Sequence, residues 1–184
     1  GAATEGPGAR LLEEVADAEP VLVLRGEPGA GKTTSCKYLA AQAACTFLER
    51  GGPLPVVVEL RRFGVRAAES PDDALARLVA SAMQPGLPAD YAPQAAHGRQ
   101  WLAEARMQRP LALFLDGLNE VGSALRDAAY EAVKNLVDHL RGTPSRVVLT
   151  TRRHGFEVFR LGTVKVFDVQ PLSAAAIRAY LQRR

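Results

Sequence analysis

Short, continuously apolar runs alternate with segments of helical periodicity along most of the chain. The apolar runs predict five strands, at residues 21–25, 54–60, 111–115, 146–150 and 164–169. Helical spacing predicts helices over 10–19, 32–48, 97–108 and 123–141, one that begins at Ser70 and a last one after Ser173. Strands without polar alternation are typical of parallel sheets that are buried on both faces. The pattern therefore predicts a three-layer α/β fold, with a central, mainly parallel five-stranded sheet and helices on both faces.

Residues that favour helix ends support these boundaries. Ser70 is followed by Pro71 and then by two acids, which is the order of an N-cap, a first-turn proline and negative charge near the positive end of a helix. Gly142 follows the helix 123–141, and glycine is the usual residue after a helix end.

Length and composition indicate one globular domain. The chain has 184 residues, 47% hydrophobic and 23% charged, which excludes a disordered chain. It has no run of roughly 20 apolar residues and no signal peptide, so we expect neither a membrane span nor secretion. The net charge of +3 is small and the basic residues are scattered, so no nucleic-acid partner is expected. We expect a cytoplasmic protein.

The two cysteines, Cys36 and Cys45, fall in one predicted helix. Nine helical residues separate their Cα atoms by about 13.5 Å, which is well beyond the limit of roughly 7 Å for a disulfide. We expect both to be buried small hydrophobic residues in a protein of a reducing compartment.

A glycine-rich segment joins the first strand to the next helix and matches the phosphate-binding pattern G-x-x-x-x-G-K-[ST]. It reads Gly26-Glu27-Pro28-Gly29-Ala30-Gly31-Lys32-Thr33, followed by Thr34. Glycines let successive backbone N–H groups converge on an anion, and the following helix points its positive end at the same place. Lys32 is expected to contact the β- and γ-phosphates, and the Thr33 hydroxyl to bind Mg²⁺. The whole segment is therefore predicted to bind a nucleotide.

Two other strands end in polar residues that nucleotide hydrolysis requires. Asp116 follows the third apolar run, in the position of a Walker B carboxylate that binds Mg²⁺. Glu120 is placed to polarise the attacking water. Arg152 follows the fourth run and is expected to sense the γ-phosphate through a charge-assisted hydrogen bond. The predicted catalytic residues are Lys32, Asp116, Glu120 and Arg152, and the predicted magnesium ligands are Thr33 and Asp116.

These motifs together resemble the NACHT family, which belongs to the STAND class of signalling ATPases in the AAA+-like branch of P-loop proteins. The resemblance rests on residues 26–34, on Leu-Phe-Leu-Asp-Gly-Leu-Asn-Glu at 113–120, on Leu-Thr-Thr-Arg at 149–152 and on the segment from 169. It covers roughly residues 10–182. It implies the strand order 2-3-4-1-5, ATP or ADP with Mg²⁺ as cofactors, and a weak ATPase with a role in signalling such as innate immunity.

The resemblance also implies a nucleotide-controlled switch, in which a closed ADP state opens to an ATP state that oligomerises and activates an effector. The family places a helical segment and a winged-helix domain after this core, an effector domain before it and a repeat sensor behind. We expect residues 1–9 to be a disordered segment left by cloning. Residues 10–184 are expected to be a NACHT-type nucleotide-binding domain that stops before the helical and winged-helix domains. As a fragment it is expected to be monomeric.

One position departs from the family pattern. The family has two adjacent acids where this chain has Asn119-Glu120. The amide of Asn119 can orient a water by hydrogen bonding, but it cannot accept a proton. We therefore expect slow hydrolysis. A scaffold that holds its nucleotide without hydrolysing it is an alternative.

A second alternative is a small-molecule or nucleoside kinase of the same fold. Such a kinase needs an acceptor pocket and an arginine-bearing lid. The stretch 61–109 contains Arg61, Arg62, Arg77, Arg99 and Arg106, which could in principle supply them. The Asp-Gly-Leu-Asn-Glu segment and the Thr-Thr-Arg strand end favour the switch. The chain lacks the guanine-reading Asn-Lys-x-Asp motif, so we favour ATP over GTP.

Overall fold

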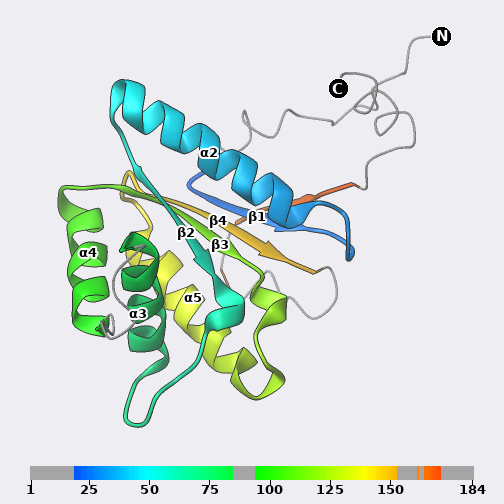
Figure 1. The fold of residues 1–184 in the computed structure, drawn as a ribbon, viewed down its shortest axis with the longest axis vertical. Coiled ribbons are helices and arrows are strands. Elements are labelled where there is room, and N and C mark those ends of the chain that lie inside the picture. The colour runs from blue at the N-terminus through cyan, green and yellow to red at the C-terminus, as the bar shows by residue number, and fades with distance from the viewer. Residues whose placement is uncertain (1–18, 85–93, 153–160, 162–163, 171–184) are drawn as a thin grey trace.

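Five parallel strands form the centre of the structure, a computed structural model that describes residues 19–84, 94–152, 161 and 164–170. Their order across the sheet is β2-β3-β4-β1-β5, and each neighbouring pair is parallel (Figure 1). The strands are β1 (Val21–Arg25), β2 (Leu54–Glu59), β3 (Leu111–Asp116), β4 (Arg146–Thr151) and β5 (Lys165–Asp168). The predicted sheet and its strand order are confirmed.

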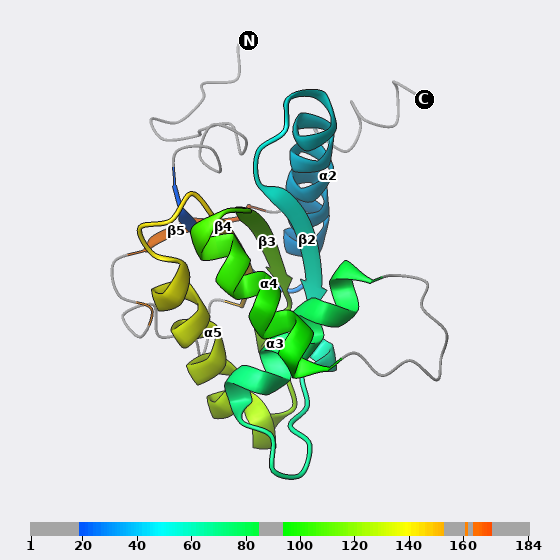
Figure 2. The same cartoon turned by 90° about the vertical axis from the view of Figure 1, so that its left-hand side faces the viewer.

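Helices cover both faces of this sheet. Helix α2 (Lys32–Arg50) lies on one face. On the other side lie α3 (Pro71–Met83), α4 (Ala95–Met107) and α5 (Arg126–Leu140), which pack against one another. Figure 2, turned by 90° from Figure 1, shows these three helices together and α2 apart from them. The result is a three-layer α/β arrangement, as predicted.

The two faces of the sheet bury separate apolar cores. Val23, Leu113 and Leu149 point to the larger core under α3 and α5. Their neighbours along the strands, such as Leu24 and Phe114, point to the smaller core under α2. Successive strand residues point to opposite faces, so a strand that is covered on both sides needs apolar residues throughout. This explains the continuous runs in the sequence.

Local sequence signals explain where α3 begins and how it packs. The Ser70 side chain accepts a hydrogen bond from the backbone N–H of Asp73 at 3.1 Å, with Pro71 in the first turn, as predicted. A Cβ on Gly98 of α4 would lie 1.8 Å from the carbonyl oxygen of Ala76 in α3. Only glycine permits this close crossing of the two helices.

Several element boundaries differ from prediction. β2 ends at Glu59, because the chain turns at Leu60–Arg62 in a short 3-10 turn (η1) that buries Leu60 in the core. The first residues of the helix predicted over 123–141 form a separate 3-10 turn, Ser123–Leu125. The segment 1–9, the helix predicted after Ser173 and all but the last residue of the helix predicted at 10–19 lie outside the described residues.

Both cysteines were predicted to be buried on the same helix. Both lie on α2, but only Cys36 is buried. Cys36 is buried in the smaller core, and burial raises the pKa of its thiol to about 12. Cys45 is exposed, because nine residues place it about half a turn away from Cys36. Neither forms a disulfide. Among the described helices, none is both long enough and apolar enough to cross a bilayer.

Candidate functional site

The phosphate loop leaves β1 and turns tightly into α2. Gly29 and Gly31 have φ of 76° and 93°, in the left-handed region that favours glycine. The backbone N–H of Ala30 donates to the carbonyl of Glu27 at 3.1 Å and closes the turn. No described side chain caps the start of α2. The N–H groups of its first turn are therefore suited to bind an anion.

Lys32 lies in the first turn of α2 and is held by the loop itself. Its Nζ atom donates to the carbonyl oxygens of Gly26 at 3.0 Å and Glu27 at 2.9 Å. A bound phosphate is a charged and therefore stronger acceptor than a carbonyl. The two carbonyls therefore hold the ammonium group in place when no nucleotide is bound. A nucleotide phosphate would give it a stronger acceptor.

Asp116 lies at the end of β3 and contacts two hydroxyls. The Thr33 hydroxyl donates to its Oδ1 at 3.2 Å, and the Thr150 hydroxyl, from β4, donates to the same atom at 2.6 Å. The backbone N–H of Gly117 donates to the Thr150 hydroxyl at 2.8 Å. The carboxylate is thus fixed beside the start of α2.

This arrangement suits Mg²⁺ when phosphates complete the site. Thr33 and Asp116 present oxygen atoms, the ligands that Mg²⁺ prefers. Within the described residues, no cluster of three His, Cys, Asp or Glu side chains is placed to hold a metal alone. Mg²⁺ in nucleotide sites usually binds through one or two protein ligands together with substrate phosphates. The residues present fit that pattern.

A second turn brings Asn119 and Glu120 to the site. Gly117 follows β3 with a φ of 82° and starts the 3-10 turn η2 (Leu118–Glu120). The Glu120 side chain folds back over this glycine, since a Cβ at position 117 would lie 3.1 Å from its Cδ atom. The backbone at 117 therefore favours glycine, and a side chain there would press on Glu120.

These segments surround a cavity of about 330 Å³. The phosphate loop and first turn of α2 form one wall, η2 another, and the end of β4 with Arg152 a third. The lining residues are Pro28, Gly29, Gly31, Lys32, Thr33, Thr34, Gly117, Asn119, Glu120, Thr150 and Arg152. Residues from three distant parts of the sequence thus meet at the carboxyl edge of the sheet, where parallel α/β folds bind ligands.

Not every predicted site residue lines this cavity. Gly26 and Glu27 accept hydrogen bonds from Lys32 through their carbonyls, and Ala30 is buried. Asp116 is not in the lining but accepts a hydrogen bond from Thr33, which is. Thr150 was not among the predicted site residues, although it lines the cavity and holds Asp116. The sequence did contain one sign of this role, since Thr150 places a hydroxyl directly after the apolar run 147–149.

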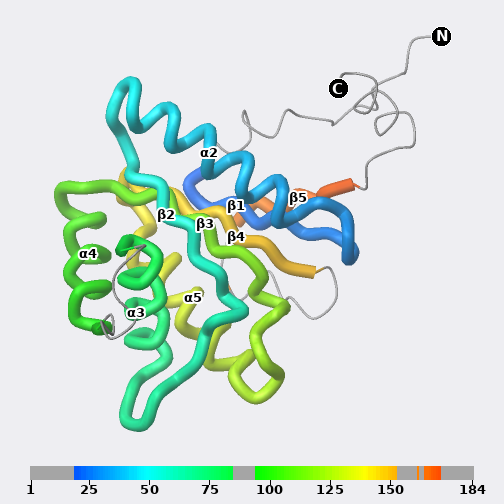
Figure 3. Tube along the Cα trace, viewed as in Figure 1, coloured from blue at the N-terminus to red at the C-terminus, as the bar shows by residue number. Residues whose placement is uncertain are grey.

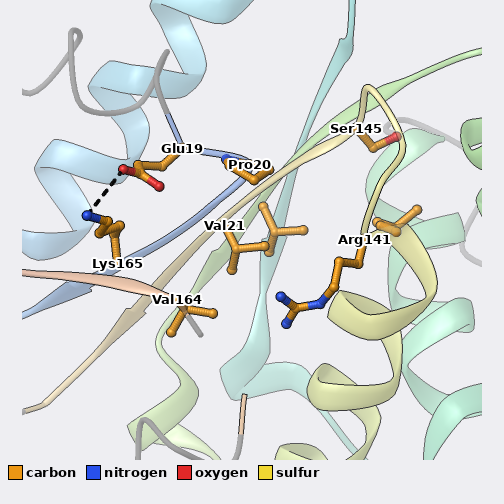
Figure 4. Close-up of a pocket in the computed structure, with 9 residues that line it drawn as sticks. Glu19, Pro20, Val21, Arg141, Ser145, Val164 and Lys165 are labelled. Atoms are coloured by element: carbon orange, nitrogen blue, oxygen red, sulfur yellow. Dashed lines mark ion pairs between the residues drawn. The ribbon is translucent and has the colours of Figure 1, made fainter. Parts of the chain in front are cut away.

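A smaller hollow lies at the opposite edge of the sheet, where the strands begin (Figure 4). It measures about 90 Å³ and is lined by Val21, Arg141 and Lys165, among others. An ion pair of 3.9 Å between Lys165 and Glu19 lies beside it. Ligand pockets usually exceed about 300 Å³, so this hollow is too small for a nucleotide.

Comparison with known proteins agrees with the site. A family model of the NACHT domain matches residues 20–184. No curated protein shows significant similarity to the sequence. Among solved structures, the Orc1 protein of Aeropyrum pernix, determined in complex with DNA, shares the fold with a TM-score of 0.64 and 17% identity. The match covers 94% of this chain and 47% of Orc1, so the chain spans about half of that protein.

Proposed function

The chain belongs to the NACHT family and is a nucleotide-binding module of the P-loop NTPase type, and we propose that it acts as the Mg²⁺-dependent, slowly hydrolysing ATP switch of a larger cytoplasmic signalling protein. One observation carries the proposal. The cavity is shared by the phosphate loop, by Glu120 and by Arg152, which are the groups that bind, cleave and sense a terminal phosphate.

In this proposal the loop and Lys32 bind the β- and γ-phosphates, while Thr33 and Asp116 hold Mg²⁺. The ion supplies charge neutralisation for the phosphate oxygens. Thr150 keeps the Asp116 carboxylate turned toward Thr33. The chain therefore prepares both metal ligands before nucleotide arrives, which lowers the reorganisation required on binding.

In this proposal, the turn η2 supplies the groups that act on the attacking water. Glu120 is the carboxylate of the cavity that can accept a proton from water, and Asn119 beside it offers only an amide. Loss of the second carboxylate removes one possible proton acceptor, so turnover is slow. A slow reaction suits a switch, because the ATP state then persists long enough to act.

Arg152 gives the module its means of distinguishing ATP from ADP. It lines the cavity from the end of β4. A γ-phosphate offers it a charge-assisted hydrogen bond that ADP lacks. We propose that this difference biases the closed and open states of the full-length protein, its contacts with helical, winged-helix and sensor domains, and its oligomerisation.

The structure gives the kinase alternative no support. None of the arginines in the stretch 61–109 lines the cavity. Arg61 and Arg62 pair with Glu59 instead, and Arg77 pairs with Glu69. The scaffold alternative differs from the switch only in turnover, so measured phosphate release separates them.

Titration with nucleotide tests the proposal. Lys32→Ala should weaken the binding of ATP with Mg²⁺ at least tenfold, because hydrogen bonds to charged groups contribute about 1.5–3 kcal/mol each. Lys37→Ala removes an exposed ammonium from the next turn of the same helix and should leave the affinity unchanged. Equal affinities for wild type and Lys32→Ala would overturn the assignment.

A further inference from the structure

The last residues of β1 and β5 are joined by a bidentate ion pair. The Nε and Nη2 atoms of Arg25 donate to the two carboxylate oxygens of Asp168 at 2.9 and 3.0 Å. Strands β1 and β5 are neighbours in the sheet (Figure 3). Arg25 and Asp168 are also register partners in this parallel pair. Each side chain is 30% exposed, and the carboxylate raises the pKa of the Arg25 guanidinium. The two parallel hydrogen bonds fix the orientation of both groups.

The backbone beyond this pair is joined equally closely. Val169, the first residue after β5, donates its N–H to the carbonyl of Arg25 at 2.7 Å. A Cβ on Gly26 would lie 2.9 Å from the carbonyl oxygen of Val169. The first glycine of the phosphate loop therefore rests directly on the backbone that leaves β5, and a side chain at position 26 has no room.

These contacts continue into the nucleotide site. The Gly26 carbonyl accepts a hydrogen bond from Lys32. An unbroken series of contacts thus leads from Lys32 through Gly26 and Arg25 to Asp168. When the Lys32 ammonium turns to a phosphate, the Gly26 carbonyl shares or loses its hydrogen-bond donor. This changes the contacts of Gly26, the residue that packs against Val169.

Strand β5 is short, and the ion pair adds to the few contacts that hold its end. It has four residues and lies at the edge of the sheet, so few backbone hydrogen bonds hold it. Its carboxyl end carries Asp168, and the partner residue Arg25 immediately precedes the phosphate loop. A charge-assisted contact at this point holds the end of the short strand to the start of the loop.

We propose that Asp168 is a positioning residue for the phosphate loop, and that its pair with Arg25 couples nucleotide occupancy to the chain that follows β5. The inference rests on the proposed function, because only a loop that binds nucleotide has an empty and an occupied state. Coupling requires that the two states differ in their contacts, and the Gly26 carbonyl provides the difference.

Hydrogen exchange of the backbone amides at 165–169 tests the coupling, with ADP and Mg²⁺ as the probe. In wild type, ADP should slow exchange in this segment. In Asp168→Asn, ADP should bind roughly two- to fivefold more weakly, the range of a partly exposed ion pair. At saturating ADP this variant should lose most of the protection. Arg25→Lys keeps the charge without the two-pronged geometry and should show the same loss.

Asp138→Asn is the matched control. Asp138 also accepts a hydrogen bond from a basic side chain, Lys134, but it lies on α5 away from the loop. This variant should keep wild-type affinity and protection, which separates a general loss of stability from the proposed coupling. If wild type binds ADP without slower exchange at 165–169, or Asp168→Asn retains the protection, the inference fails and the proposed function stands. If wild type binds no nucleotide, both fail.

Discussion

The hydroxyl of Thr150 donates a 2.6 Å hydrogen bond to Oδ1 of Asp116 and thereby joins the end of β4 to the end of β3. It also accepts the N–H of Gly117 at 2.8 Å. Leu115 and Leu149 are register partners, so the residues that follow them lie side by side. One buried hydroxyl therefore positions the carboxylate that we assign to Mg²⁺ and the turn that carries Glu120.

Thr150→Val should destabilise the protein and weaken Mg²⁺-dependent nucleotide binding. The change keeps the shape but leaves the Gly117 N–H without its partner, at a cost of about 1–3 kcal/mol. Urea unfolding measures the loss. Thr151→Val is the matched control, because Thr151 is equally buried and its hydroxyl has no hydrogen-bond partner among the residues that the structure describes. Its stability should be unchanged or increased. Equal losses in both variants would show that the Thr150 bond is unimportant.

Glu120→Gln should abolish most hydrolysis while ATP still binds. An amide of the same size cannot accept a proton, and general base catalysis contributes about 10²-fold or more. Phosphate release and nucleotide affinity, measured on one preparation, check both parts. Asn119→Asp should increase turnover, because it adds a carboxylate to the cavity. If Glu120→Gln hydrolyses ATP at the wild-type rate, Glu120 is not the general base.

Gly117→Ala should impair both folding and hydrolysis. A non-glycine residue at a φ of 82° costs about 1–2 kcal/mol, and the new methyl group would displace the Glu120 side chain. Gly142→Ala introduces the same strain at a φ of 77° with no atom within 4 Å of the new Cβ. The control should lose similar stability and keep its turnover, provided both are measured well below their melting temperatures. A normal rate in Gly117→Ala contradicts the role given to this turn.

The Glu69–Arg77 ion pair should make stability depend on pH. It is largely buried, with side-chain exposures of 11% and 13%, and the hydrogen bond from Arg77 lowers the pKa of Glu69. Because the folded-state pKa is lowered, the pair stabilises fully above the ordinary value of 4.5 and loses its effect as pH falls through the folded value. Glu69→Gln should cost about 1–3 kcal/mol at pH 7.

Unfolding free energies of wild type and Glu69→Gln should converge as pH falls below 4.5. Glu59→Gln serves as the control, because the arginines that pair with Glu59 are mostly exposed and such pairs contribute little. Its loss at pH 7 should be much smaller. A difference between wild type and Glu69→Gln that does not change with pH would contradict this assignment.

Much of the fold follows from local sequence. The apolar runs place the five strands within a few residues, because a strand buried on both faces leaves no room for polar positions. Ser70 and Pro71 mark the start of α3 for a similarly local reason. The phosphate loop is equally local, since its glycines, Lys32 and Thr33 are consecutive.

The parts that sequence did not reveal depend on contacts between distant segments. The bond between Thr150 and Asp116 requires the register of β3 and β4, which periodicity does not specify. Arg25 and Asp168 are 143 residues apart and meet only in the folded sheet. Cys45 was wrongly expected to be buried. The hydrophobic character of cysteine suggested burial, but the helix periodicity places Cys45 on a different side of α2 from Cys36.

The most direct test of the central claim is ATP affinity with and without Mg²⁺, in wild type and in Asp116→Asn. Asparagine retains the oxygen that accepts from Thr33 and Thr150 but removes the charge that would hold the metal. Mg²⁺ should strengthen ATP binding by wild type and have little effect on the variant. If Mg²⁺ leaves wild-type affinity unchanged, or strengthens both proteins equally, the metal-assisted nucleotide site proposed at Thr33 and Asp116 is wrong.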